Sequence, residues 1–192
     1  MAVPDTPGPD IRAIASRVVY QDRWMTLRCD EIERRDGNRG TYTVVDKRDF
    51  ALVVPAERDG FHLVEEYRYP IGRRSVAFPQ GGFPGGRAGD PEELARRELA
   101  EETGLRASGL TLLGFLHCAH GITGQGFHAY LATGLTQGAY SREAEEQDMR
   151  HFWVTRTQFK EMIRWGDVTD DATLAAYSLL LLHEERQATA AS

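Results

Sequence analysis

The feature that most constrains the fold is the segment from Pro79 to Gly104. In it a glycine-rich loop leads directly into a strongly marked helix. The loop reads PQGGFPGGRAGDP, and its five glycines permit positive φ angles and close approach of the backbone to a ligand. Asp90 is a suitable N-cap, Pro91 suits the first helical position, and Glu93 completes a capping-box pattern. Because Gly104 suits the position just after a helix, the pattern predicts a helix between Asp90 and Gly104.

Three acidic residues of this helix share one face. At about 100° per residue, Glu98, Glu101 and Glu102 fall on the side that also carries Leu94. Acids three or four residues apart repel each other by a few tenths of a kcal/mol, so we expect a cation against this face. Mg²⁺ takes carboxylate oxygens, keeps several waters and completes its shell with substrate phosphates. The sequence therefore predicts a Mg²⁺ site, which Mn²⁺ can also fill.

Two other interpretations of this segment remain. An acid-rich helix can present a solvated face held by ion pairs such as Arg97 with Glu101, but the adjoining glycine loop favours the metal. A glycine loop before a helix can also cradle a phosphate. No Gly-Lys-Ser/Thr ending follows the loop, which excludes a P-loop.

Composition places the helix in one globular domain with short appendages. With 192 residues, 41% hydrophobic and 27% charged, the chain is long enough for one complete core. The formal net charge of -6 argues against a non-specific nucleic-acid or anionic-membrane surface. The start MAVPDTPGPD lacks the features of a secretory signal, and no apolar run reaches the roughly 20 residues of a membrane span. Cys29 and Cys118 form no disulfide framework, so we expect a cytoplasmic location.

Short β-type runs and turns occupy most of the remaining chain. A hairpin is predicted from Trp24 to Val45, with its turn at Asp36-Gly37. Further strands are predicted at 50–55, 61–64, 75–78, 110–118, 127–132 and 152–154, and two more helices over about 156–164 and 171–186. We expect a loose tail at 1–10, an N-terminal β extension at 11–48, a main domain at 49–187 and a loose tail at 188–192.

The run RELAEETGL, from Arg97 to Leu105, resembles the second half of the Nudix box, G-x5-E-x7-R-E-U-x-E-E-x-G-U with U aliphatic. It matches at every fixed position. The first half departs, because Gly89 occupies the slot of the first Glu and Gly82 precedes that slot by one residue too many. In the family this Glu mainly stabilises the loop, so the departure concerns local rigidity rather than chemistry.

The resemblance extends from about Ser16 to His183. The segments LVEEYRYPIGRRSVAFPQGG and EAEEQDM are similar to the ADP-ribose pyrophosphatase branch of Nudix hydrolases. This resemblance implies an α/β fold, a Nudix α/β/α sandwich with a mixed sheet and an N-terminal antiparallel β extension. It also implies hydrolysis of a nucleoside diphosphate sugar to a nucleoside monophosphate and a sugar phosphate, by a homodimer whose N-terminal strands help to build the partner's site.

The same resemblance implies roles for particular residues. The metal ligands would be Glu98, Glu101 and Glu102 with the backbone carbonyl of Gln80, and Glu101 and Glu102 would thereby be catalytic. An acid of a late loop serves as general base or extra ligand in this branch, and the candidates are Glu145 and Glu146. Such chemistry is consistent with the residues, because clustered Mg²⁺ ions neutralise phosphate oxygens and lower the pKa of a bound water.

Four basic residues are candidates for substrate binding. Arg68, Arg73 and Arg74 suit the phosphates or the terminal ribose, and the alternative for each is a surface arginine. ADP-ribose-specific members carry a proline about fifteen residues beyond the box, where this chain has His120. Because histidine titrates near neutrality, His120 suits contact with a base or phosphate or a role as accessory acid, against the alternative of a structural histidine at a strand end.

Two other functions are compatible with the sequence. One is a Nudix hydrolase of another nucleotide class, such as a dinucleoside polyphosphate, coenzyme A or an RNA 5′ end. The other is a sensor that binds ADP-ribose without hydrolysing it. The three intact glutamates of the box argue against the sensor, and the acidic balance weakens the RNA substrate.

Overall fold

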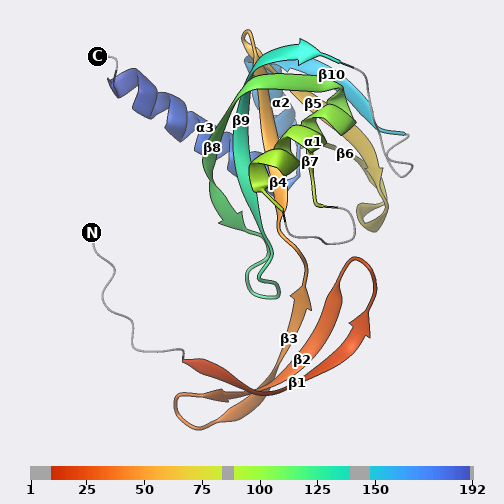
Figure 1. Ribbon diagram of the computed structural model, residues 1–192, viewed down its shortest axis with the longest axis vertical. Coiled ribbons are helices and arrows are strands. Elements are labelled where there is room, and N and C mark those ends of the chain that lie inside the picture. The colour runs from red at the N-terminus through yellow and green to blue at the C-terminus, as the bar shows by residue number, and fades with distance from the viewer. Residues whose placement is uncertain (1–9, 84–88, 139–147, 191–192) are drawn as a thin grey trace. The chain divides into compact units, whose positions relative to one another are not determined.

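The structure is a computed structural model that describes residues 10–83, 89–138 and 148–190. The chain divides into two compact units (Figure 1). The first holds the chain up to Arg48 together with Ala119–Gln125, and the second holds Asp49–Cys118 and the chain from Gly126 onward. Each unit is described below by itself.

The first unit is a three-stranded antiparallel sheet of β1 (Ile11–Gln21), β2 (Thr26–Arg34) and β3 (Arg39–Asp46). The predicted hairpin is confirmed as β2 and β3, and the Asp36 carboxylate accepts a hydrogen bond from the Asn38 N–H in its turn. Every residue of β1 is exposed, so its sequence carries no periodic signal of a strand. Of the expected tail at 1–10, the structure describes Asp10, whose carbonyl accepts from the Arg35 N–H.

The loop Ala119–Gln125 belongs to this first unit although it follows β8 in the chain. The Tyr42 hydroxyl donates to the Gly121 carbonyl at 2.8 Å, and the Val45 N–H donates to the Ile122 carbonyl at 2.9 Å. Both bonds tie the loop to β3. His120 is therefore part of the N-terminal unit.

The second unit is built on a mixed seven-stranded sheet in the order β10-β5-β4-β9-β8, with β6 added on β5 and β7 on β4. The β4–β9 pair is parallel and the other pairs are antiparallel. A 3₁₀ turn at Tyr69–Ile71 joins β5 to β6. The strands are β4 (Phe50–Glu57), β5 (Gly60–Arg68), β6 (Arg73–Ala77), β7 (Gln80–Gly81), β8 (Leu105–His117), β9 (Gly126–Gln137) and β10 (Arg150–Thr155).

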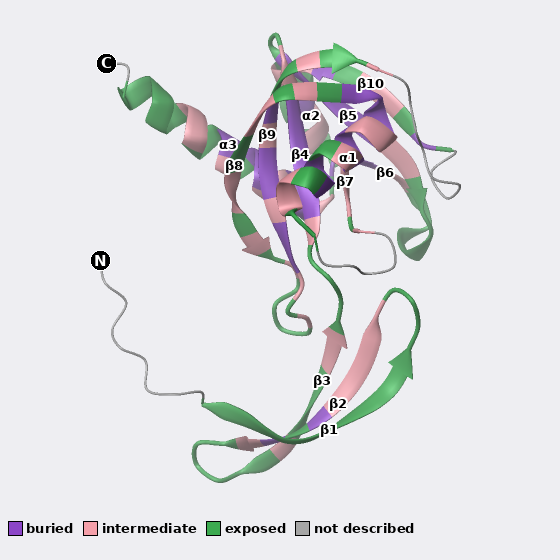
Figure 2. Cartoon of the chain, in the orientation of Figure 1, coloured by how far each residue is buried: buried purple, intermediate pink, exposed green. Residues whose placement is uncertain are grey.

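Helices cover both faces of this sheet, and the expected α/β/α sandwich is confirmed. Helix α1 (Pro91–Thr103) packs on one face, while α2 (Arg156–Trp165) and α3 (Asp171–Ala190) pack on the other (Figure 1). Successive residues of β4 alternate between the two core clusters, as side chains of a strand must. Figure 2 shows the buried residues concentrated in β4 and in its neighbours β5 and β9.

Several element ends differ from the sequence expectations. β8 begins at Leu105 and β9 continues to Gln137, because both pair along nearly their whole length. Helix α3 continues to Ala190, so residues 188–190 are helical rather than part of a loose tail. The Asp90 carboxylate caps the N–H of Glu92 instead of that of Glu93, while a complete capping box forms at α2. Within the described residues, no helix is long and apolar enough to cross a membrane.

Candidate active site

The acidic face of α1 is largely buried. Glu98 and Glu102 are each 3% exposed, and the side chain of Glu101 is 19% exposed. Leu94 and Leu99 are buried on the same helix, so the two inner glutamates lie beside an apolar layer. A buried carboxylate is costly unless it is hydrogen-bonded, paired or bound to a metal. The arrangement agrees with the helical wheel, and it is typical of a binding site rather than of a solvated helix.

A backbone segment, Phe78–Gly81, crosses this acidic face, and we call it the strap. The Gln80 N–H donates to the Glu102 carboxylate at 3.2 Å. Gly81 lies directly against Glu98, since a Cβ at this glycine would come within 2.4 Å of the Glu98 Oε2. The strap therefore contacts both buried carboxylates with main-chain atoms, and a side chain at Gly81 would displace the Glu98 carboxylate.

The first turn of α3 holds the strap from its other side. The Phe78 N–H donates to the Thr173 Oγ1 at 2.9 Å in a buried hydrogen bond. The Gln80 Nε2 donates to the Asp170 Oδ2 at 3.0 Å, and the same oxygen accepts from the Thr173 N–H at 2.8 Å. Sequence reasoning missed Asp170 and Thr173. Asp170 carries the signal of an N-cap residue, but nothing in the sequence indicates its second partner.

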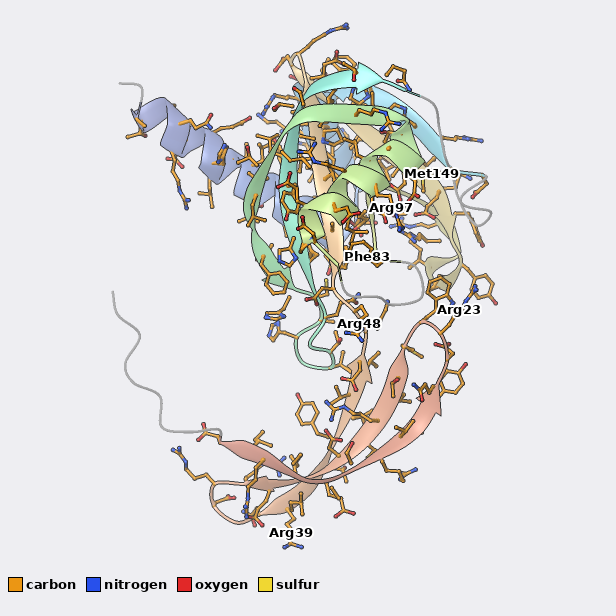
Figure 3. All side chains as sticks on the ribbon, viewed as in Figure 1. Arg23, Arg39, Arg48, Phe83, Arg97 and Met149 are labelled. Carbon is orange, nitrogen blue, oxygen red and sulfur yellow. The ribbon has the colours of Figure 1, made fainter. Side chains whose placement is uncertain are left out.

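Arg97 folds over the acidic face and bonds to two of its carboxylates. Its Nε donates to Glu101 at 3.0 Å and its Nη2 to Glu98 at 3.3 Å. Its guanidinium carbon also lies 5.9 Å from the centre of the Phe83 ring (Figure 3). The Arg97–Glu101 ion pair that was weighed as an alternative to a metal site is thus present, and it orients Glu101.

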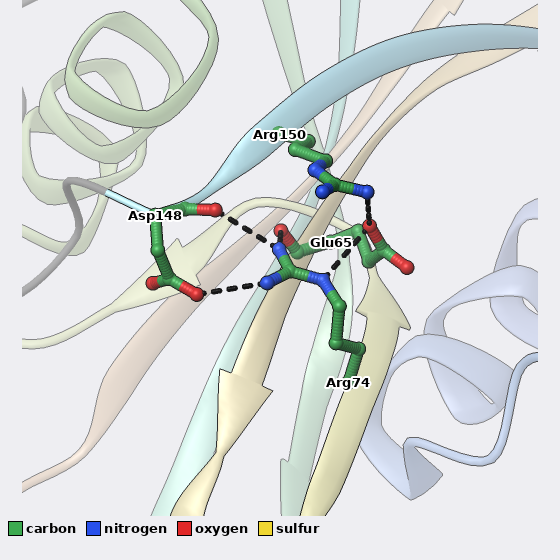
Figure 4. Close-up of polar contacts among 4 residues, drawn as sticks. All are labelled: Glu65, Arg74, Asp148 and Arg150. Atoms are coloured by element: carbon green, nitrogen blue, oxygen red, sulfur yellow. Dashed lines mark hydrogen bonds and ion pairs between the residues drawn. The ribbon is translucent and has the colours of Figure 1, made fainter.

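Arg74 is the centre of an ion-pair network between β5, β6 and the start of β10 (Figure 4). Its Nε lies 3.0 Å from the Glu65 carboxylate, and its Nη1 donates to Asp148 at 2.9 Å. Arg150 joins through Glu65 at 3.4 Å. Burial alone would lower the pKa of Arg74, but hydrogen bonds and charge from Glu65 and Asp148 outweigh it and raise that pKa.

The other two candidate arginines also have protein partners. Arg68 pairs with Glu66 at 2.7 Å and keeps 47% of its side chain exposed. Arg73 is exposed and donates to the Thr169 hydroxyl at 2.8 Å. Both remain accessible from solvent, whereas Arg74 is more enclosed.

The NUDIX domain family matches residues 46–176, and the N-terminal domain family of nucleoside diphosphate sugar hydrolases matches residues 11–45. The chain belongs to the NUDIX family. An ADP-ribose pyrophosphatase of Mycobacterium tuberculosis is 31% identical over 169 residues, which cover 86% of this chain and 81% of that protein. An ADP-ribose pyrophosphatase of Bacillus subtilis is 27% identical, covering 92% of this chain and 96% of the relative.

A crystal structure of an ADP compounds hydrolase matches this Nudix chain with a TM-score of 0.82 at 19% identity. The match covers 95% of this chain and 98% of the other. At this identity the match shows a shared fold.

The structure brings together part of the ligand set expected for a Nudix protein. Glu98, Glu101, Glu102 and Gln80 all lie where α1 meets the strap. Glu145 and Glu146 lie outside the described residues, and His120 belongs to the N-terminal unit.

The donor chemistry of this Nudix site fits a hard divalent cation. Among the residues that the structure describes, no three acidic, histidine or cysteine side chains already converge as a metal cluster. The Glu101 carboxylate is turned toward Arg97. Two buried carboxylates and a main-chain segment remain, and Mg²⁺ binds through one or two carboxylates when water and substrate phosphates supply the other oxygens.

Proposed function

We propose that this Nudix protein hydrolyses the pyrophosphate of a nucleoside diphosphate linked to another group, with ADP-ribose or an ADP-sugar as substrate. The products would be AMP and a sugar phosphate. The observation that carries the proposal is the pair of buried carboxylates, Glu98 and Glu102, held against the main chain of the strap. The names of the two bacterial relatives support the choice of substrate.

Glu98 and Glu102, with the Gln80 carbonyl, would hold Mg²⁺ or Mn²⁺. A bound divalent ion supplies neutralisation of phosphate oxygens and a more acidic water. Glu101 is the third carboxylate of this face, and Arg97 holds it in one orientation. A carboxylate of Glu145 or Glu146 would accept the proton of the attacking water.

Four basic residues would either contact the substrate or position other residues that act on it. Arg68 and Arg73 are accessible and carry guanidinium groups that suit phosphate oxygens. Arg74 would act mainly by fixing Asp148, the first described residue after the segment that contains Glu145 and Glu146. His120 would contact the base or a phosphate.

The protein would act as a cytoplasmic homodimer. Strand β1 leaves several large apolar residues exposed, among them Ile11, Val18 and Val19, and burial of such residues stabilises a dimer. Cys29 and Cys118 are free thiols, which suits a reducing compartment. Sedimentation velocity of the full chain tests the dimer, and a monomer at micromolar concentration would contradict it.

A substrate panel tests the activity. ADP-ribose, other nucleoside diphosphate sugars, dinucleoside polyphosphates and coenzyme A are incubated with the enzyme and Mg²⁺, and products are identified by mass. We expect AMP and ribose 5-phosphate from ADP-ribose, and a loss of orders of magnitude in Glu102→Gln. Glu93→Gln is the matched control, because Glu93 is exposed on the same helix. An inert panel with intact ADP-ribose binding would favour the sensor instead.

A further inference from the structure

Phe83 and Gly89 both belong to the glycine-rich loop, six residues apart, and they contact each other. A Cβ placed on Gly89 would come within 2.4 Å of Cζ and 2.5 Å of Cε2 of the Phe83 ring. Gly89 has no left-handed φ angle, so the backbone conformation alone does not require glycine. The requirement is space, because the aromatic ring occupies the volume of any side chain at position 89.

The same ring lies beneath Arg97. The 5.9 Å between the guanidinium carbon and the ring centre is within the range of a cation–π contact, and Figure 3 labels both side chains. Phe83 also packs against the core cluster under α1. The ring is therefore fixed by Gly89 and the core, and it offers a firm surface to a long side chain.

Arg97 connects this ring to the acidic face. Its two donors reach Glu101 and Glu98, at 3.0 and 3.3 Å. An arginine side chain has many rotamers, and ordering it costs conformational entropy. A flat apolar surface below the guanidinium removes the rotamers that point away from the carboxylates.

We propose that Phe83 is a positioning residue of the Nudix site: its ring, seated on Gly89, supports Arg97 and so sets the orientation of Glu98 and Glu101. This proposal rests on the proposed function, because that function assigns Glu98 to a metal and places Glu101 on the same acidic face. It also gives a physical reason for the glycine at the position where the box pattern has its first Glu. A side chain there would displace the ring.

The test measures Mn²⁺ binding to the full-length protein without nucleotide, from the electron paramagnetic resonance of free Mn²⁺. Removing groups that orient metal ligands commonly weakens metal binding 10–100-fold, so we expect about tenfold weaker binding in Phe83→Leu. Glu93→Gln, an exposed substitution on the same helix, is the control and should bind within about twofold of the wild type. Thermal unfolding confirms that each variant is folded.

A double-mutant cycle tests the contact between the two residues. Gly89→Ala alone should weaken Mn²⁺ binding about as much as Phe83→Leu, because its methyl group displaces the ring. The double variant should be no weaker than Phe83→Leu, since no ring remains to be displaced. Losses that add in the double variant would overturn the proposal.

Two further outcomes separate this proposal from the proposed function. A Phe83→Leu protein that unfolds at lower temperature but binds Mn²⁺ as the wild type does would make the ring a purely structural element, whatever the substrate. If Phe83→Leu binds Mn²⁺ more weakly than the wild type does, but the wild type hydrolyses no compound of the panel, the proposed function is refuted and the role of Phe83 remains.

Discussion

The hydrogen bond from Phe78 to Thr173 links helix α3 to the strap, and replacing Thr173 with valine removes it without changing the side-chain shape. Both residues are fully buried, so the Phe78 N–H loses its acceptor in a place that water does not reach. Leaving a buried N–H unsatisfied costs about 1–3 kcal/mol of stability, and burial of the added methyl group contributes about 0.8 kcal/mol. We expect Thr173→Val to lower the free energy of unfolding by about 0.2–2 kcal/mol.

Thr173→Ser is the matched control, because it keeps the acceptor oxygen and loses only a buried methyl group. That loss costs about 1 kcal/mol, so the two variants should be similarly destabilised. Their effects on the site should differ. The valine variant frees the strap beside Glu102 and should lose activity and Mn²⁺ affinity, while the serine variant should keep both.

Urea unfolding gives the stability of the two variants, and turnover with Mn²⁺ titration reports on the site. Equal losses of activity in the two variants would refute the link between α3 and the acidic face. A valine variant as stable as the wild type would show that the Phe78 N–H finds another acceptor.

Three further outcomes follow from the geometry. Gly60→Ala should destabilise the protein by about 2 kcal/mol in urea unfolding, because its Cβ would lie 2.2 Å from the Val154 carbonyl oxygen of the partner strand; an unchanged midpoint would contradict this. The pKa of Asp22 is lowered, chiefly by hydrogen bonds from backbone N–H groups, that of Met25 first. Since the folded pKa lies below the unfolded value, this turn is stabilised above that value and loses stability as pH falls through the folded pKa, which NMR titration of the Met25 amide can follow. Glu102→Gln should leave the metal-free protein at least as stable as the wild type in thermal unfolding while activity is lost; a clear fall in stability would argue that the carboxylate has a structural role.

Helix α1 was predictable because its information is local. The cap at Asp90, the terminating Gly104 and the apolar spacing all lie within one short segment. The carboxylates of Glu98 and Glu102 followed from the same spacing, since a helix of fixed pitch leaves no freedom in which face they share. The ion pair of Arg97 with Glu101 was also visible from its spacing of four residues.

The supports of that face were not predictable, because they depend on contacts between distant parts of the chain. Thr173 lies 95 residues from its partner Phe78, and Asp170 lies 90 residues from Gln80. The local sequence around a buried helical threonine is the same whether its hydroxyl forms a hydrogen bond within the helix or with another segment. Strand β1 was expected only as part of the β extension at 11–48, and its bounds were not predicted, since none of its residues is buried in the chain by itself.

The burial of Glu98 and Glu102 shows how the fold and the proposed chemistry depend on one another. Two neighbouring carboxylates removed from water repel each other and lose hydration, so the isolated helix gains nothing from this placement. The chain offsets part of that cost with two donors: the Gln80 N–H, which donates to Glu102, and the Arg97 guanidinium, which donates to Glu98. Gly81 packs against Glu98 without a side chain that would displace its carboxylate. A hard divalent cation adds the remaining positive charge, and its binding free energy then stabilises the folded state in which the ligands are already placed.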